Sequence, residues 1–172
     1  MNNQIMDFSK PKNGKKILIS EEQNGMMIWL GNNEVIQKSA GQVFYNAIAA
    51  QLESVAVMPQ IAMPGSKLIM ELYSFDATVK KWDQKIATAE KLVQSVDCEE
   101  WLFFSFNELK LESAQWYGFK LSCNEGQIAI AEGIQKHGDN TQKSMQWTAN
   151  AAHDAGHFHK DFHLAYMVAL AA

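Results

Sequence analysis

Arginine is absent from this chain of 172 residues, in which all 15 basic residues are lysines. Arginine is the side chain best suited to paired hydrogen bonds with phosphate, carboxylate and guanine groups. The formal net charge of the chain is −4. A mildly acidic chain without arginine is a poor candidate for nucleic-acid binding, and we therefore expect no nucleic-acid partner.

Long apolar runs and export signals are also missing. No run approaches 18 apolar residues, and the polar residues 1–16 are not followed by the apolar segment of a signal peptide. The only two cysteines are Cys98 and Cys123, which we expect to be reduced and buried rather than paired. Together these absences predict a soluble, cytoplasmic protein with no membrane partner.

The overall composition is that of an ordinary globular protein. Hydrophobic residues make up 47% of the chain and charged residues 20%, and a chain of this length can bury a core without disulfides or a structural metal. We expect residues 1–15 to be a loosely ordered lead-in and residues 16–172 to form a single domain.

Turn signals and alternating apolar residues predict strands and two hairpins. Asn24-Gly25 separates apolar runs at 17–19 and 26–30, and Asn124-Glu125-Gly126 separates alternating segments at 117–123 and 127–132. Further strands are predicted at 34–37, 67–74 and 101–106. The last of these is nearly all apolar, which is typical of a central strand buried on both faces.

Three other segments have apolar residues spaced by three and four, as in helices. Ser39 and Gln42 form a candidate capping box for a helix that runs to Val55. Asp76 is the candidate N-cap of a second helix that runs to Val96, and residues 141–170 predict one or two further helices. The expected fold is therefore α+β: a mostly antiparallel sheet of about five to seven strands, with two or three helices packed on one face.

Histidines are concentrated near the C-terminus, where His153, His157, His159 and His163 fall within eleven residues. Histidines four residues apart share a face of a helix and can chelate one metal ion. On an unbroken helix the two pairs would point in nearly opposite directions, so four ligands could not converge unless the helix breaks. We favour a structural role for these histidines, with a divalent metal site as the alternative, and expect no other cofactor.

Aromatic residues are dense between positions 101 and 119. Trp101, Phe104, Trp116 and Tyr117 are candidates for lining an apolar ligand pocket, although aromatic residues more often form a core. No nucleotide-binding or nucleophile motif is present. We therefore expect a non-enzymatic accessory or interaction domain that binds a protein partner or forms a homodimer. The alternatives are a metal-dependent enzyme built on the histidine cluster and a binder of small apolar ligands.

Overall fold

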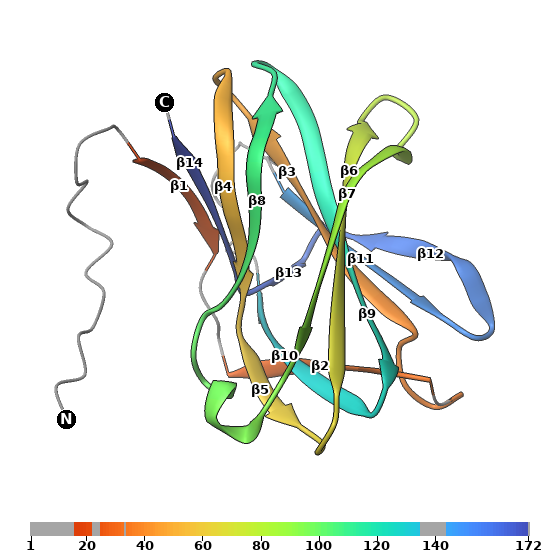
Figure 1. Cartoon of the computed structure of the whole chain (residues 1–172). Coiled ribbons are helices and arrows are strands. Elements are labelled where there is room, and N and C mark those ends of the chain that lie inside the picture. Colours follow the sequence, from red (N-terminus) through yellow and green to blue (C-terminus); the bar gives the residue numbers. More distant parts are fainter. Residues whose placement is uncertain (1–15, 22–24, 33, 135–143, 172) are drawn as a thin grey trace, which may run out of the picture.

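A computed structural model describes residues 16–21, 25–32, 34–134 and 144–171 of the chain. In these residues fourteen strands form nearly all of the regular structure, and the only helical element is the short 3-10 turn η1 (Ser95–Asp97) (Figure 1). The predicted α+β fold with two or three helices is therefore wrong, and the fold is all-β. No helix in the described part of the chain is long and apolar enough to cross a membrane.

The strands form three sheets in which all neighbouring strands are antiparallel. The large sheet has the order β12 (His153–His159), β11 (Ser144–Asn150), β3 (Ser39–Asn46), β9 (Gln115–Glu125), β6 (Lys67–Asp76) and β7 (Lys81–Leu92). The second sheet has the order β1 (Lys16–Glu21), β14 (Tyr166–Ala171), β4 (Ala50–Val57) and β8 (Leu102–Leu111). The third has the order β13 (Phe162–Leu164), β10 (Gln127–Ile134) and β2 (Met26–Gly31), with β5 (Pro59–Ala62) also paired to β10.

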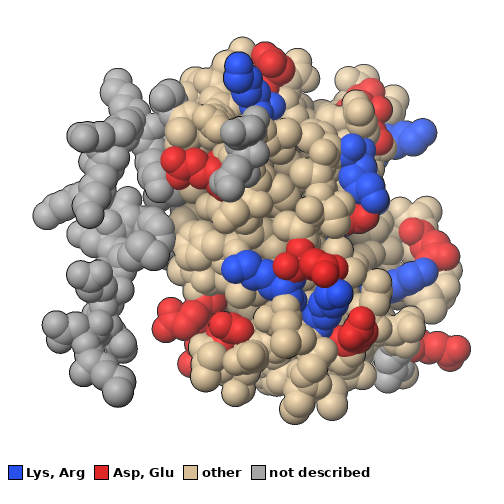
Figure 2. Space-filling model, in the orientation of Figure 1, with Lys and Arg blue, Asp and Glu red and all other residues tan. Residues whose placement is uncertain are grey.

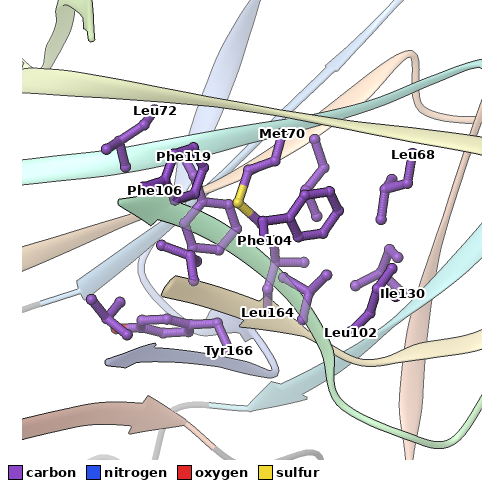
Figure 3. Close-up of a cluster of buried hydrophobic side chains, with 14 of the residues drawn as sticks. Leu68, Met70, Leu72, Leu102, Phe104, Phe106, Phe119, Ile130, Leu164 and Tyr166 are labelled. Carbon is purple, nitrogen blue, oxygen red and sulfur yellow. The ribbon is translucent and has the colours of Figure 1, made fainter. Parts of the chain in front are cut away.

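The main hydrophobic core lies between the large sheet and the second sheet. Figure 3 shows Met70 and Phe119 of the large sheet near Phe104 and Tyr166 of the second sheet, and all four side chains are buried. Burying a side chain of this kind contributes about 1.5–3 kcal/mol relative to leaving it exposed. The third sheet closes one end of this sandwich with the buried residues Leu30, Ile128 and Ile130.

Residues 39–55, for which a helix was predicted, instead form β3 and the first part of β4. Gln42 does not cap a helix. It is completely buried, and its side-chain oxygen accepts a hydrogen bond from the backbone N–H of Leu164 over 2.9 Å. Asn46 ends β3 and donates its side-chain amide to the carbonyl oxygen of Ile48 over 2.6 Å. This bond stabilises the turn between the two strands.

The helix predicted over residues 76–96 is also wrong, because most of this segment forms β7 at the edge of the large sheet. Two register shifts in the β6–β7 pair, between Leu72 and Phe75, move the apolar positions out of strict alternation. Their spacing therefore imitates that of a helix. Val79 and Val96, which seemed to extend the apolar stripe, are 65% and 77% exposed and lie in connections.

The helices predicted over residues 141–170 are replaced by β11 to β14, with residues 141–143 lying outside the described residues. Leu164, Tyr166, Val168 and Leu170 belong to the main core at every second position, as in a strand, and the small residues Ala165 and Ala169 between them are buried as well.

Two glycine turns that predicted hairpins instead carry the chain between sheets. The strands on either side of Gly25, β1 and β2, pair with β14 and β10 rather than with each other. Asn24 itself lies outside the described residues. The strands on either side of Gly126, β9 and β10, also belong to different sheets. Both glycines have a φ of 77°, which glycine adopts readily, but the predicted pairings are wrong.

The strands predicted at 67–74, 117–123 and 127–132 are confirmed as parts of β6, β9 and β10. The strand predicted at 101–106 is confirmed as the start of β8, but it is not central. Among the described strands β8 ends its sheet, and Ser105 is exposed. The strand predicted at 34–37 reduces to a single bridge between Leu30 and Gln37.

Candidate ligand-binding cleft

A cleft of about 410 Å³ lies at one end of the large sheet, where the end of β6, the start of β7 and the start of β9 meet. Trp116, which is half-buried, supplies the aromatic wall and packs on Tyr45 with ring centroids 5.3 Å apart. Asp76 and Asp83 supply two carboxylates, and none of the lining residues is basic. We call this site the tryptophan–aspartate cleft; its lining residues are Ser74, Phe75, Asp76, Ala77, Thr78, Asp83, Gln115, Trp116 and Tyr117.

Each carboxylate of the cleft is held in place through one of its two oxygens. Asp76 accepts backbone N–H bonds from Thr78 and Val79 through Oδ1, over 2.8 and 3.2 Å. Asp83 accepts the hydroxyl of Ser74 through Oδ2 over 3.1 Å. Among the described residues, no hydrogen bond engages the second oxygen of either carboxylate, and both aspartates are exposed, so the cleft presents two acceptors beside an aromatic wall.

A second aromatic cluster covers the neighbouring part of the same sheet face. Trp82 reaches from the edge strand β7 across the sheet and lies over Gly41 and Gly118. A Cβ atom on Gly118 would lie 2.7 Å from the Trp82 ring and 2.6 Å from the backbone carbonyl oxygen of Gln42, so only glycine leaves room for the indole. The ring centroids of Trp82 lie between 5.4 and 6.0 Å from those of its aromatic neighbours Tyr73, Phe75, Trp147 and Phe158.

Lys120 lies among the rings of this cluster. Its Nζ is 4.7 Å from the centroids of Tyr73 and Trp147 and 5.0 Å from that of Trp82. Such distances allow cation–π attraction. Burial lowers the pKa of Lys120, and the negative charge of Glu71, its partner on β6, opposes this shift.

Glu71 joins Lys120 to a short polar network on the outer face of the sheet. It accepts hydrogen bonds from Lys85 over 2.8 Å and from the hydroxyl of Tyr73 over 2.9 Å. Burial alone would raise the pKa of Glu71, but these bonds and the charges of Lys85 and Lys120 outweigh it, so the pKa is lowered. Burial and the contact with Glu71 raise the pKa of Tyr73 to about 12.

The lowered pKa of Glu71 predicts a contribution to stability that depends on pH. Because the native state binds the proton more weakly than the unfolded chain, this contribution is complete above the ordinary glutamate pKa and is lost as the pH falls through the native value. Glu71→Gln should therefore lower the free energy of unfolding at pH 7 by about 1 kcal/mol or less, and by a smaller amount in acid. Urea unfolding of both proteins over a pH series tests this, and an equal difference at every pH would contradict it.

The four residues predicted to line an apolar pocket do not meet at one site. Trp116 and Tyr117 both line the tryptophan–aspartate cleft. Phe104 lies in the main core and is completely buried, whereas Trp101 is half-buried just before β8.

The four predicted histidine ligands separate into one pair and two single residues. His153 and His157 are exposed on β12, with ring centroids 5.2 Å apart. His159 has its Nε2 2.9 Å from the hydroxyl of Thr148. His163 is buried and lies on β13, with its Nδ1 3.2 Å from the carbonyl oxygen of Leu164.

A smaller cleft of about 300 Å³ lies where β5 is followed by β6 and where β7 ends. Its rim includes Met63 and Leu92, which are 47% and 59% exposed. This cleft is apolar and has no carboxylate among its lining residues, so its chemistry differs from that of the tryptophan–aspartate cleft.

On the face of the molecule in Figure 2, lysines and acidic residues lie interspersed.

Sequence reasoning missed Asp83, Trp82 and Lys120. Asp83 and Trp82 were assigned to a helix, and Lys120 is one of 15 lysines with no local signal that distinguishes it. Asp76 was expected to cap a helix, and its carboxylate does accept two backbone N–H groups, although in a turn between strands. Only the pairing of β6, β7 and β9 brings these residues together.

Comparison with known proteins gives no assignment. No protein-family model matches the chain, and no curated protein has significant sequence similarity to it.

Proposed function

We propose that this chain is a non-enzymatic interaction domain that binds a protein partner, and that a basic side chain of the partner enters the tryptophan–aspartate cleft. The observation that carries the proposal is the pairing of two fixed carboxylates with a half-buried tryptophan in one cleft of about 410 Å³. A lysine or arginine side chain satisfies both features, because its charged end bonds to carboxylates and its apolar stem packs on an aromatic ring.

Electrostatics supports a cationic partner group over an anionic or neutral one. The free oxygens of Asp76 and Asp83 can only accept hydrogen bonds while ionised, so an anionic group would be repelled and left without donors. The aromatic wall adds attraction for a cation, since the face of an indole ring carries partial negative charge. The chain itself is net negative, which favours encounter with a basic segment.

The test uses short peptides with one lysine or arginine between neutral residues, and matched peptides with glutamine at that position. Binding is followed by NMR shifts of the Trp116 indole N–H. We expect basic peptides to bind in preference to neutral ones. Asp83→Asn should weaken their binding about two- to fivefold, because Asp83 is exposed and an exposed ion pair is worth about 0.2–1 kcal/mol. Higher salt should weaken binding to the native protein and have less effect on the variant.

Asp97→Asn is a matched control for this experiment. The carboxylate of Asp97 also accepts a backbone N–H, that of Gln94 over 2.8 Å, but it lies outside the cleft, and the substitution should leave peptide binding unchanged. Equal affinity for basic and neutral peptides would contradict the proposal, as would an unchanged affinity in Asp83→Asn. Binding of a neutral saccharide at Trp116, with no binding of basic peptides, would also contradict it.

A further inference from the structure

We infer that His153 and His157 form a chelating site for one divalent transition-metal ion on the exposed face of β12. The two imidazole rings are 5.2 Å apart between centroids, with their planes at 71°. Imidazole is a preferred ligand of Zn²⁺, Cu²⁺ and Ni²⁺, and it binds in the neutral form through one ring nitrogen.

The separation of the rings matches the geometry of two imidazoles on one ion. A zinc–nitrogen bond of about 2.0–2.1 Å places each ring centre about 3.2 Å from the metal, and a tetrahedral angle then separates the two centres by about 5 Å. The observed centroid separation of 5.2 Å agrees with this value. Both side chains are exposed, so each ring is free to rotate and direct a nitrogen at the ion.

The backbone of β12 explains why histidines four residues apart meet on a strand. In a regular strand, such residues would be about 13 Å apart. Here the pairing of β12 with β11 shifts in register between Thr148 and Asn150, and Gly156 has a φ of 70°. A Cβ atom at Gly156 would come within 2.3 Å of the Trp147 indole, so the glycine also allows the bulge to pack closely against the sheet.

The protein supplies two ligands, and the remaining coordination positions are open to water. Among the described residues, no group of three or more His, Cys, Asp and Glu side chains is placed to hold one ion. Asp154, the neighbour of His153, forms an ion pair with Lys38 over 3.3 Å. The site is therefore an open chelate rather than a closed structural centre.

Isothermal titration of Zn²⁺ into protein purified without a histidine tag tests the site. We expect one zinc ion per chain and no binding of Mg²⁺, which prefers oxygen ligands. His153→Ala and His157→Ala should each raise the dissociation constant for zinc at least about tenfold, because each removes one arm of the chelate. Both side chains are exposed, so neither substitution should disturb the fold.

His159→Ala is the matched control, since this histidine lies on the same strand but is hydrogen-bonded to Thr148. It should leave the affinity for zinc unchanged. The inference is overturned if native protein binds no zinc at millimolar concentration, or if His153→Ala and His157→Ala bind zinc as tightly as the native protein. Because β12 contributes no residue to the tryptophan–aspartate cleft, this result is independent of the peptide-binding test.

Discussion

Replacing Phe104 with alanine should lower the free energy of unfolding by about 3–5 kcal/mol, the usual cost of removing a buried phenylalanine ring. Phe104 is completely buried in the main core between the large sheet and the second sheet. In Figure 3 its ring lies beside Met70. The cost has two parts: the lost transfer of the ring from water, and the cavity that the strands on both sides cannot close.

Phe103→Ala is the control for this substitution. Phe103 is the neighbouring residue on β8, is half-buried, and points away from the core, so its loss should cost about 1 kcal/mol. Urea denaturation of the three proteins gives both differences. A cost for Phe104→Ala no larger than that for Phe103→Ala would show that the two sheets do not pack as described.

The strands that could be predicted from the sequence are those with regular alternation. In β9, Tyr117, Phe119, Leu121 and Cys123 are all buried, and this pattern predicted the strand correctly. Prediction failed where bulges interrupt alternation, as in β7, because an interrupted period of two can resemble the three-and-four spacing of a helix.

Turn residues predicted where the chain bends but not what the strands pair with. Gly25 and Gly126 both adopt the positive φ that their sequences indicate. The strands that follow them nevertheless pair with each other in a third sheet, through contacts such as Ile128 with Leu30. This choice depends on burying apolar side chains over long sequence distances, which short-range turn patterns do not encode.

The candidate sites were predictable in part, and for different reasons. The four-residue spacing of His153 and His157 drew attention to a pair that does meet, but through a bulged strand rather than a helical turn. Trp116 was singled out for its aromatic surroundings, whereas its partners in the cleft, Asp76 and Asp83, come from a hairpin about 35 residues earlier. Residues brought together only by sheet topology carry no shared local signal.

Replacing Trp82 with alanine should lower the free energy of unfolding by about 3 kcal/mol, at the low end for a large aromatic residue because Trp82 is only half-buried. The indole is the centre of the second aromatic cluster and packs on Phe75, which also lines the tryptophan–aspartate cleft. Its removal would uncover Gly41 and Gly118, over which the indole lies, and leave a groove across the sheet.

Trp82→Ala should also raise the pKa of Lys120. Burial is the main cause of the lowered pKa in the native protein, and removing the indole admits water beside the ammonium group, which favours its charged form. The lost cation–π contact acts in the opposite direction but is the smaller effect, so a fall in the pKa would contradict this prediction. An NMR titration of the Lys120 side chain measures the shift directly.

Trp82→Phe separates packing from the indole N–H. The Nε1 atom of Trp82 is buried without a hydrogen-bond partner among the described residues, so phenylalanine removes an unsatisfied donor while it keeps an aromatic ring in place. We expect this variant to lose less than half as much stability as Trp82→Ala and to keep a lowered Lys120 pKa. If Trp82→Ala left the free energy of unfolding unchanged, the indole could not pack over the two glycines as described.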